Sequence, residues 1–191
     1  MTTKAPDQFS EYEVKESTVK FEGESETAMP LGCVGTLEET LNVKTITKDC
    51  EGVRRKTVVR PTGDGEIKFT LHMRWEAFKR MFGLISDGYA AGVYAYGRDG
   101  MHEHFCYTAK VKDEDGNIKL KAYPDCVVST GIQTKIENGA EEVSEIEVTA
   151  TTLADTYGNC MYQCFASDVT EDIANNWLQN FDHDLIVAAG E

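Results

Sequence analysis

A strict alternation of apolar and polar residues in the segment GEIKFTLHMRW is the feature that most constrains how this 191-residue chain can fold. Every second residue from position 67 to 75 is large and apolar, and the residues between them are polar or charged: Ile67, Phe69, Leu71, Met73 and Trp75 against Glu66, Lys68, Thr70, His72 and Arg74. In a β-strand, successive side chains point to opposite faces of the sheet. The segment therefore predicts a strand with one face in an apolar core.

The same period of two recurs in three later segments. EHFCYTAKV predicts a strand over 103–111, and the Asp-Gly turn of KDEDGNIKL joins it to a strand over 118–122. CVVSTGIQTKI predicts a strand from Cys126 to Ile136. EIEVTAT predicts a further strand, with Ile146, Val148 and Ala150 in the core and Glu145, Glu147 and Thr149 opposite.

Two strands are also expected earlier in the chain, over Leu41–Thr47 and Val53–Arg60, around the turn-prone KDCEG. The glycines and proline of PTGDG predict a turn from there into the next strand. The segment VRRKTVVR has charged residues on both of its alternating faces. A strand of this kind is poorly specified by its own core, so it can be an edge or an extension that meets another chain.

Helices are expected at two places. RWEAFKRMFG places Trp75, Phe78 and Phe82 on one stripe and ends at a C-cap glycine, Gly83. DVTEDIANNWLQNF begins with the capping-box spacing of Asp168 and Glu171, and its apolar residues repeat at helical intervals. The expected fold is therefore mainly β, an antiparallel β-sandwich or partial barrel with one or two flanking α-helices. We expect a single domain over 1–191 with a flexible N-terminal arm over 1–11.

Charge is segregated along the chain, whose formal net charge is −14. Residues 1–135 carry all 19 Lys and Arg against 21 acids, whereas residues 136–191 carry twelve acids and no Lys or Arg. Between Lys44 and Arg80, ten basic residues face five acidic ones. Such asymmetry indicates that each region has its own partner. The overall acidity disfavours tight binding to nucleic acid or to an anionic membrane.

Candidate catalytic or metal-binding residues are few. His102, His104 and Cys106 fall on one face of a strand and could ligate zinc with a fourth donor. Alternate side chains of a strand lie about 6–7 Å apart, however, which is a stretch for three ligands of one ion. No nucleophile or phosphate-binding loop is recognisable, and with no signal peptide the six cysteines are expected to be free thiols of a protein made in the cytoplasm. We expect no enzyme, cofactor or metal; the alternatives are a small β-domain with a His/Cys metal site and a β-sandwich binding module.

Four stretches carry a resemblance to a known family: MPLGCVGTLEETLNVKTITKDCEG, RRKTVVRPTGDGEIKFTLHMRW, GVYAYGRD and AKVKDEDGNIKLKAYPDCVVSTGI. In this order they resemble the major tail protein of long-tailed phages and prophages of Gram-positive bacteria, from Tyr12 to about Leu185. The resemblance implies a tail-tube subunit, a β-sandwich or partial barrel that assembles into stacked hexameric rings. The rings form the hollow conduit through which genomic DNA leaves the capsid.

The resemblance also implies partners and a location. The partners are other copies of the chain together with tape-measure, tail-initiation and tail-terminator proteins. Genomic DNA would pass through without specific binding, no membrane is involved, and the subunit would reside in the virion tail after synthesis in the cytoplasm of the host bacterium.

By the same resemblance, the hairpin over Leu41–Arg60, with its tip at Asp49–Gly52, reaches a neighbouring ring. Its candidate interface residues are Arg54, Arg55, Lys56 and Arg60, and the acids they could meet are Glu141, Glu142, Asp168 and Asp172. Alternatively, these charges pair within one subunit or face water. Glu145 and Glu147 are the candidate lumen-facing acids, because carboxylates do not hold DNA; the competing view places them against a neighbour's arginines.

Overall fold

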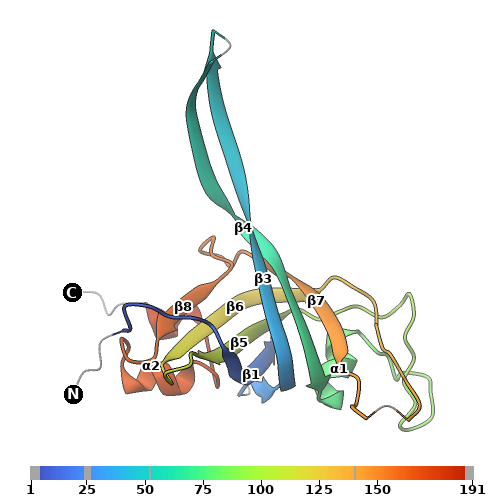
Figure 1. Ribbon diagram of the computed structural model, residues 1–191. Coiled ribbons are helices and arrows are strands. Elements are labelled where there is room, and N and C mark those ends of the chain that lie inside the picture. Colours follow the sequence, from blue (N-terminus) through green and yellow to red (C-terminus); the bar gives the residue numbers. More distant parts are fainter. Residues whose placement is uncertain (1–4, 24–26, 52, 140, 188–191) are drawn as a thin grey trace.

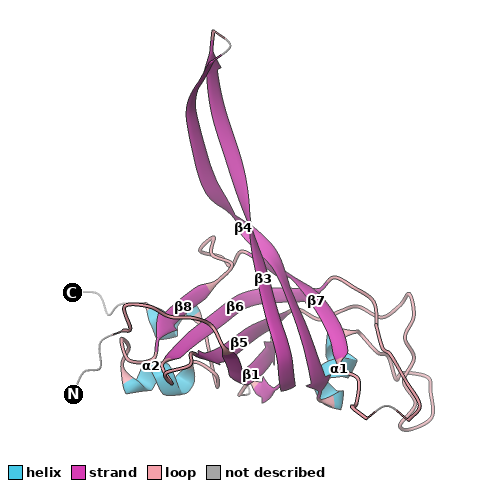
Figure 2. Ribbon diagram, viewed as in Figure 1, coloured by secondary structure: helices cyan, strands magenta, loops and turns pink. Residues whose placement is uncertain are grey.

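The computed structural model describes residues 5–23, 27–51, 53–139 and 141–187. It is mainly β, with eight strands in one antiparallel sheet and three short helices (Figures 1 and 2). The strands are β1 (Glu13–Phe21), β2 (Met29–Pro30), β3 (Gly32–Cys50), β4 (Val53–Met73), β5 (Phe105–Lys112), β6 (Ile118–Val128), β7 (Ile146–Leu153) and β8 (Tyr162–Phe165). The helices are α1 (Trp75–Met81), α2 (Glu171–Asn176) and α3 (His183–Ile186). The expected antiparallel β class with flanking helices is confirmed.

The strands follow the order β2-β1-β5-β6-β7-β4-β3, and β8 pairs with β6. The two ends of this order come back toward each other, because β1 and β3 are in contact and Leu31 N donates to Ser17 O at 3.1 Å. Side chains from β1, β4, β5, β6 and β7 enter one buried cluster. The strands thus surround the core as a single curved sheet, the partial-barrel form of the expected fold.

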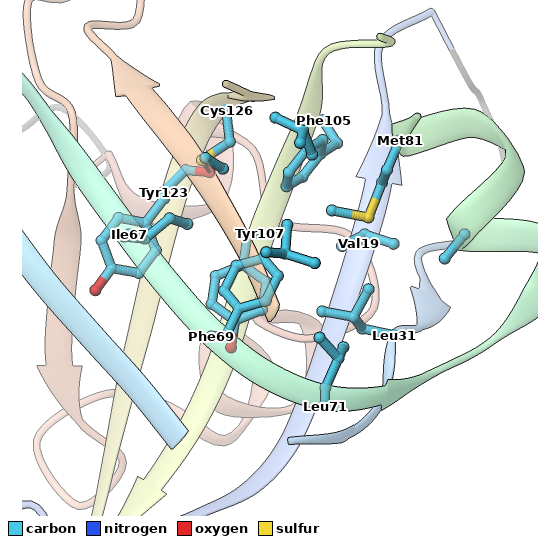
Figure 3. Close-up of a cluster of buried hydrophobic side chains, with 14 of the residues drawn as sticks. Val19, Leu31, Ile67, Phe69, Leu71, Met81, Phe105, Tyr107, Tyr123 and Cys126 are labelled. Atoms are coloured by element: carbon cyan, nitrogen blue, oxygen red, sulfur yellow. Dashed lines mark hydrogen bonds between the residues drawn. The ribbon is translucent and has the colours of Figure 1, made fainter. Parts of the chain in front are cut away.

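The core is built from the alternating positions read in the sequence. Ile67, Phe69 and Leu71 on β4 are fully buried. Phe69 stacks on Tyr107 with ring centroids 5.5 Å apart at the middle of the cluster (Figure 3). Helix α1 adds Met81 to the same cluster (Figure 3). The burial of Ile67, Phe69 and Leu71 confirms the alternation predicted for β4, because successive side chains of a strand point to opposite faces.

Helix α1 ends as its sequence predicts, and Phe78 and Phe82 of its predicted stripe pack in the core cluster, whereas Trp75 does not. Gly83 follows the helix with φ +60°, and a Cβ there would lie 2.3 Å from Met101 O. The buried helix residues are Ala77 and Met81, whereas Trp75 is 52% exposed at the first position of the helix. Trp75 was expected on the core face of the preceding strand; this is wrong, because β4 ends at Met73 and the chain turns into the helix there.

The C-terminal helices cover the outer side of β6 and β8. Trp177 and Phe181 pack with Leu120 and Ala122 of β6 in a second buried cluster, and Trp177 Nε1 donates to Lys121 O at 3.0 Å. The helix expected after residue 168 exists, but its cap is Thr170, whose side chain accepts from Ile173 N. The helix α3 was not expected.

The segment PTGDG is not a turn, which corrects the expectation of two separate strands. β4 runs through it, and Thr62, Gly63 and Asp64 form a bulge opposite Asn42, between the pairs Leu41–Gly65 and Val43–Pro61. Asn42 Nδ2 donates to Asp64 Oδ2 at 2.7 Å, and Thr62 Oγ1 donates to Asn42 O at 3.1 Å. Bulges accept glycine in the left-handed region, here Gly63 at φ +85°, and proline is tolerated where a strand has become an edge.

A smaller bulge lies at Gly35, between the pairs Val34–Leu71 and Thr36–Thr70.

Another expectation is wrong at β6, which is one strand from Ile118 to Val128 and stops there. Ser129 N donates to Thr149 O at 2.9 Å, and the chain leaves the sheet beyond this hydrogen bond. Ile136, which was expected on the core face, is 89% exposed. β7 continues from Ala150 to Ile146, but the chain after Ser129 diverges from it, although the alternation of CVVSTGIQTKI continues.

Residues 5–11 of the expected N-terminal arm lie against the body, and residues 1–4 are outside the described residues. Phe9 packs edge-on against Phe165 with ring centroids 5.2 Å apart. Ala5 N donates to Asp168 Oδ1 at 3.1 Å, and Tyr12 N donates to Lys112 O at 3.0 Å. These contacts place the segment across β8 and β6.

Candidate assembly surfaces

The most prominent feature of the molecule is the part of the β3–β4 hairpin that projects from the body (Figure 1). We call residues 43–61 the hairpin arm. The pairing of β4 with β7 ends at Gly65–Thr152, beside the bulge at Asn42. Among the described residues, β3 and β4 have no third strand beside them beyond that point. The arm is therefore a two-stranded ribbon with two free edges, which is the geometry that pairs or packs with another chain.

Cross-strand pairing gives the hairpin arm two chemically different faces. Three pairs on one face are uncharged: Val43–Pro61, Thr45–Val59 and Thr47–Thr57. The alternating pairs on the other face are Lys44–Arg60, Ile46–Val58 and Lys48–Lys56. Two lysine or arginine pairs thus flank an apolar pair on the cationic face. Like charges directly opposite each other are unfavourable in an isolated sheet, so a counter-charge from outside would stabilise the ribbon.

The four predicted interface cations all lie exposed on the hairpin arm, but not on one face. Lys56 and Arg60 belong to the cationic face. Arg55 is the extra residue of a bulge between the pairs Lys48–Lys56 and Asp49–Arg54. Arg54 lies near the tip with Nε 3.9 Å from Asp49 Oδ1, and Gly52 of the predicted tip is outside the described residues. Lys44 and Lys48 complete the cationic face and were missed, although their spacing in the sequence could have indicated them.

A second surface is formed by two long loops near α1, over 84–104 and 129–145 (Figure 1). Most of the large exposed apolar side chains outside the arm belong to these loops or to the start of α1: Trp75, Tyr89, Val93, Tyr96, Met101, Ile136 and Val143. Trp75 packs edge-on against Tyr94 with ring centroids 5.6 Å apart. An exposed apolar patch marks an interaction surface, and these loops carry the side chains from which one could form. The tyrosines of GYAAGVYAYG are a weak sequence signal for this surface.

The four acids proposed as partners of the hairpin arm lie in different surroundings. Glu141 and Glu142 are exposed in the loop 129–145, which also carries Ile136 and Val143. Asp168 accepts from Ala5 N, and Asp172 Oδ1 accepts from Asn176 Nδ2 at 3.0 Å. The two loop glutamates are therefore the better candidates for a contact with another subunit, since the two aspartates already have partners within this one.

The predicted lumen acids, Glu145 and Glu147, lie on the outer face of the sheet. Val148 and Ala150 of β7 are fully buried, which confirms the alternation of this strand. Glu147 Oε1 pairs with Lys68 Nζ of β4 at 2.9 Å. The carboxylate of Glu145 lies over the backbone of Gly35, where a Cβ would approach Oε1 to 2.3 Å. Threonines of β3, β4 and β7 surround them, so this face is polar and acidic.

The candidate zinc ligands have other partners. His102 Nδ1 is 2.8 Å from Val128 O, and His104 Nδ1 is 2.7 Å from Asp125 Oδ1. Burial raises the pKa of the Cys106 thiol to about 12, so it is a poor thiolate donor. No group of three His, Cys, Asp or Glu residues that could hold a metal ion occurs in the described part of the chain. Nor does any helix there have the length and apolar character to cross a membrane.

Comparison with known proteins gives no family. No protein-family model matches the chain, and no curated protein matches it. Among solved structures, the cap that terminates the tube of the anti-feeding prophage is similar, with 13% identity, a TM-score of 0.43, and 87% of this chain and all of that one covered.

Two further structures are similar at the same level. One is the sheath–tube complex of an extracellular contractile injection system in its extended state, with 11% identity, a TM-score of 0.47 and coverage of 78% and 88%. The other is the baseplate of the anti-feeding prophage, with 10% identity, a TM-score of 0.38 and coverage of 86% and 97%. At these TM-scores the similarity carries no argument about function.

Proposed function

We propose that this protein is the structural subunit of a phage-type tail tube, which assembles into hexameric rings stacked as a conduit for DNA ejection. The observation that carries the proposal is the hairpin arm, together with the sequence resemblance over nearly the whole chain. A two-stranded hairpin without a hydrophobic face against a core is at best marginally stable alone. An arm of this length with Val43, Ile46 and Val59 at least half exposed is best explained by a partner that covers it.

A second copy of the same chain supplies a complementary surface. Residues 43–61 contain six basic and two acidic residues, whereas residues 129–145 contain one basic and four acidic residues. Both surfaces also expose apolar side chains. A contact between two different patches on identical subunits is heterologous and repeats without limit unless it closes, which is the symmetry that rings and stacked tubes require. We propose that the arm contacts Glu141 and Glu142 of a neighbouring subunit.

The outer face that carries Glu145 and Glu147 is the proposed wall of the conduit. DNA binds proteins largely through release of counterions by Lys and Arg, so a face of carboxylates and threonines leaves the duplex mobile. The pair Glu147–Lys68 leaves the proposed wall acidic, because Glu145 and the neighbouring Glu38 and Glu66 remain. DNA thus passes without specific binding. Tape-measure, tail-initiation and tail-terminator proteins are the proposed further partners.

The assembly is tested by electron microscopy of the purified protein at increasing concentration, with sedimentation velocity on the same samples. We expect rings or tubes that form less readily as salt screens the charged contacts. A protein that remains monomeric at high concentration, alone and with tail-initiation proteins, would show that the proposal is wrong.

The wall is tested separately with the double substitution Glu145→Lys and Glu147→Lys. If the two acids line the conduit, tubes still form but DNA binds inside them, which a salt-sensitive DNA retention assay detects. If folded subunits no longer form tubes, these acids belong to an interface between subunits instead.

A further inference from the structure

A buried ion cluster lies on the core side of β6, apart from the surfaces described above. Lys121 is 1% exposed, and its ammonium contacts Glu11 Oε2 at 2.7 Å and Glu39 Oε1 at 2.9 Å. Tyr123, two residues along the same face of β6, donates its hydroxyl to the other oxygen of Glu39. One buried cation therefore holds two carboxylates that come from distant parts of the chain.

The two carboxylates come from opposite sides of a seam in the sheet. β1 and β3 are near the two ends of the strand order, and the Leu31–Ser17 hydrogen bond holds them together at one end of the seam. Further along, residues 11–14 and 34–37 line a groove of about 360 Å³ between them. Glu11 lies on the first side and Glu39 belongs to the strand on the second. Lys121, on β6, contacts both carboxylates. Within the described residues, β1 and β3 form no hydrogen-bonded ladder at this place.

Each carboxylate lies on an element that extends beyond the core: Glu11 on the N-terminal segment, and Glu39 on β3 opposite Ile67 of β4. Glu39 is two residues before Leu41, the last body pair of β3 before the bulge from which the hairpin arm departs. Glu11 belongs to the N-terminal segment 5–12, which is held on the surface by Phe9 and by a few hydrogen bonds. Lys121 is thus the common partner of the N-terminal segment and the base of the arm.

We propose that Lys121 couples the N-terminal segment to the hairpin arm, so that displacement of one loosens the other. When Glu11 leaves, a buried ammonium keeps a single carboxylate, and a buried ion with incomplete pairing is strongly unfavourable. The cluster therefore favours two states, with both elements docked or both released. A partner that binds the N-terminal segment changes the freedom of the arm without contacting it, and linkage requires the reverse effect as well.

The coupling is tested by amide hydrogen exchange on the unassembled subunit, so the result does not depend on whether tubes form. The substitution Glu11→Gln keeps the size of the side chain and removes its charge. We expect exchange to become at least tenfold faster in residues 5–12 and also in residues 38–42 and 64–66, with the core amides of β5 and β7 unchanged. By reciprocity, Glu39→Gln accelerates exchange in residues 5–12.

The matched control is Glu16→Gln, which removes an exposed ion pair with Lys110 on β1 and β5 and does not touch the cluster. It leaves exchange at the base of the arm unchanged. The double variant of Glu11→Gln with Glu39→Gln gives an acceleration smaller than the product of the two single effects, because each single variant already removes the coupling through Lys121. The proposal is overturned if Glu11→Gln leaves residues 38–42 and 64–66 unaffected, or if it accelerates β5 and β7 equally, which would report general loss of stability.

Discussion

The body and the hairpin arm are built from the same two strands, yet they differ in what fixes their side chains. In the body, β4 lies between β3 and β7, and Ile67, Phe69 and Leu71 are fully buried. Beyond Gly65, the same strand keeps only β3 beside it, and Val59 is 56% exposed. Hydrogen bonds between strands continue through both regions, whereas burial stops at the bulge.

This difference separates two roles of an alternating sequence. In the body, the alternation is enforced by a core that accepts one face and excludes the other. In the arm, no core selects the residues, and the alternation instead places the Lys44–Arg60 and Lys48–Lys56 pairs on one face. The arm is therefore free to be shaped by contacts outside the subunit.

The largest expected contrast in the free energy of unfolding comes from truncating one side chain in each region. Phe69→Ala removes a fully buried ring that stacks on Tyr107 and should cost about 3–5 kcal/mol. Val59→Ala in the arm should cost less than about 0.5 kcal/mol, as exposed substitutions do. Urea denaturation of the unassembled subunit measures both. Similar costs at the two positions would mean that the arm folds back onto a core.

A smaller contrast in the free energy of unfolding is expected between two glycines with positive φ, Gly83 in the body and Gly63 at the base of the arm. At Gly83, a Cβ would lie 2.3 Å from Met101 O, so Gly83→Ala combines a clash with strain and should cost on the order of 2 kcal/mol or more. At Gly63, the nearest atom is Gly158 O at 3.3 Å, so Gly63→Ala should cost about 1 kcal/mol from strain alone. Thermal unfolding measured by circular dichroism ranks the two. The reverse order would contradict the tight packing after α1.

A smaller effect is expected from the pH dependence of the N-terminal segment. Burial alone would raise the pKa of Glu11, but hydrogen bonds from Lys121 and Lys119 outweigh it and lower the pKa below its ordinary value of 4.5. The stability from Glu11 is therefore present above about pH 4.5 and is lost as the pH falls through the lower pKa of the folded state. Wild type should unfold at higher urea than Glu11→Gln near pH 6, and the difference should shrink toward pH 3. A constant difference would show that the charge of Glu11 is not involved.

The smallest effect on the subunit itself, and the most specific effect on assembly, is expected from Lys56→Glu with Arg60→Glu. Both side chains are exposed on the cationic face, so unfolding should change by less than about 0.5 kcal/mol. Rings or tubes should nevertheless be lost in electron micrographs. The control, Lys15→Glu with Lys112→Glu, reverses as many charges on β1 and β5. Normal tubes from the arm variant would show that its cationic face is only solvated.

The sequence predicted the body better than it predicted the loops and the arm. Strands around Phe69, Tyr107 and Val148 were predicted because apolar and polar residues alternate along each of them, which gives a clear period of two. The end of β6 was not predicted, since residues after Val128 keep the same alternation although the chain diverges from β7 there. Whether a strand has a neighbour depends on the rest of the fold.

The candidate surfaces were predicted in part for a similar reason. The basic character of the arm is a local property and could be read directly, so Lys56 and Arg60 were identified. The face on which Lys56 and Arg60 lie, together with Lys44 and Lys48, depends on the pairing register of β3 and β4. That register could not be predicted, because PTGDG was expected to be a turn. The Lys121 cluster joins residues 11, 39 and 121, and nothing in the local sequence of any of them indicates the others.

The bulges at Gly35 and at Thr62–Asp64 on the β3–β4 hairpin differ by one inserted residue, and that difference decides whether the charged residues of both strands share one side of the arm. One extra residue at Gly35 moves the inward positions of β3 from even to odd numbers, so that Val34 and Leu37 both pack against the core. At Thr62–Asp64, β4 gains two residues over β3, an even number, so its odd positions stay in step and the inward row that includes Ile67 continues as the uncharged row of Val59 and Thr57. Deleting one residue there would turn Lys56 and Arg60 of β4 to the side opposite Lys44 and Lys48 of β3, while leaving the arm's own sequence intact. The number of residues in the bulge at Thr62–Asp64 therefore decides whether the subunit presents its positive charge on one side of the arm.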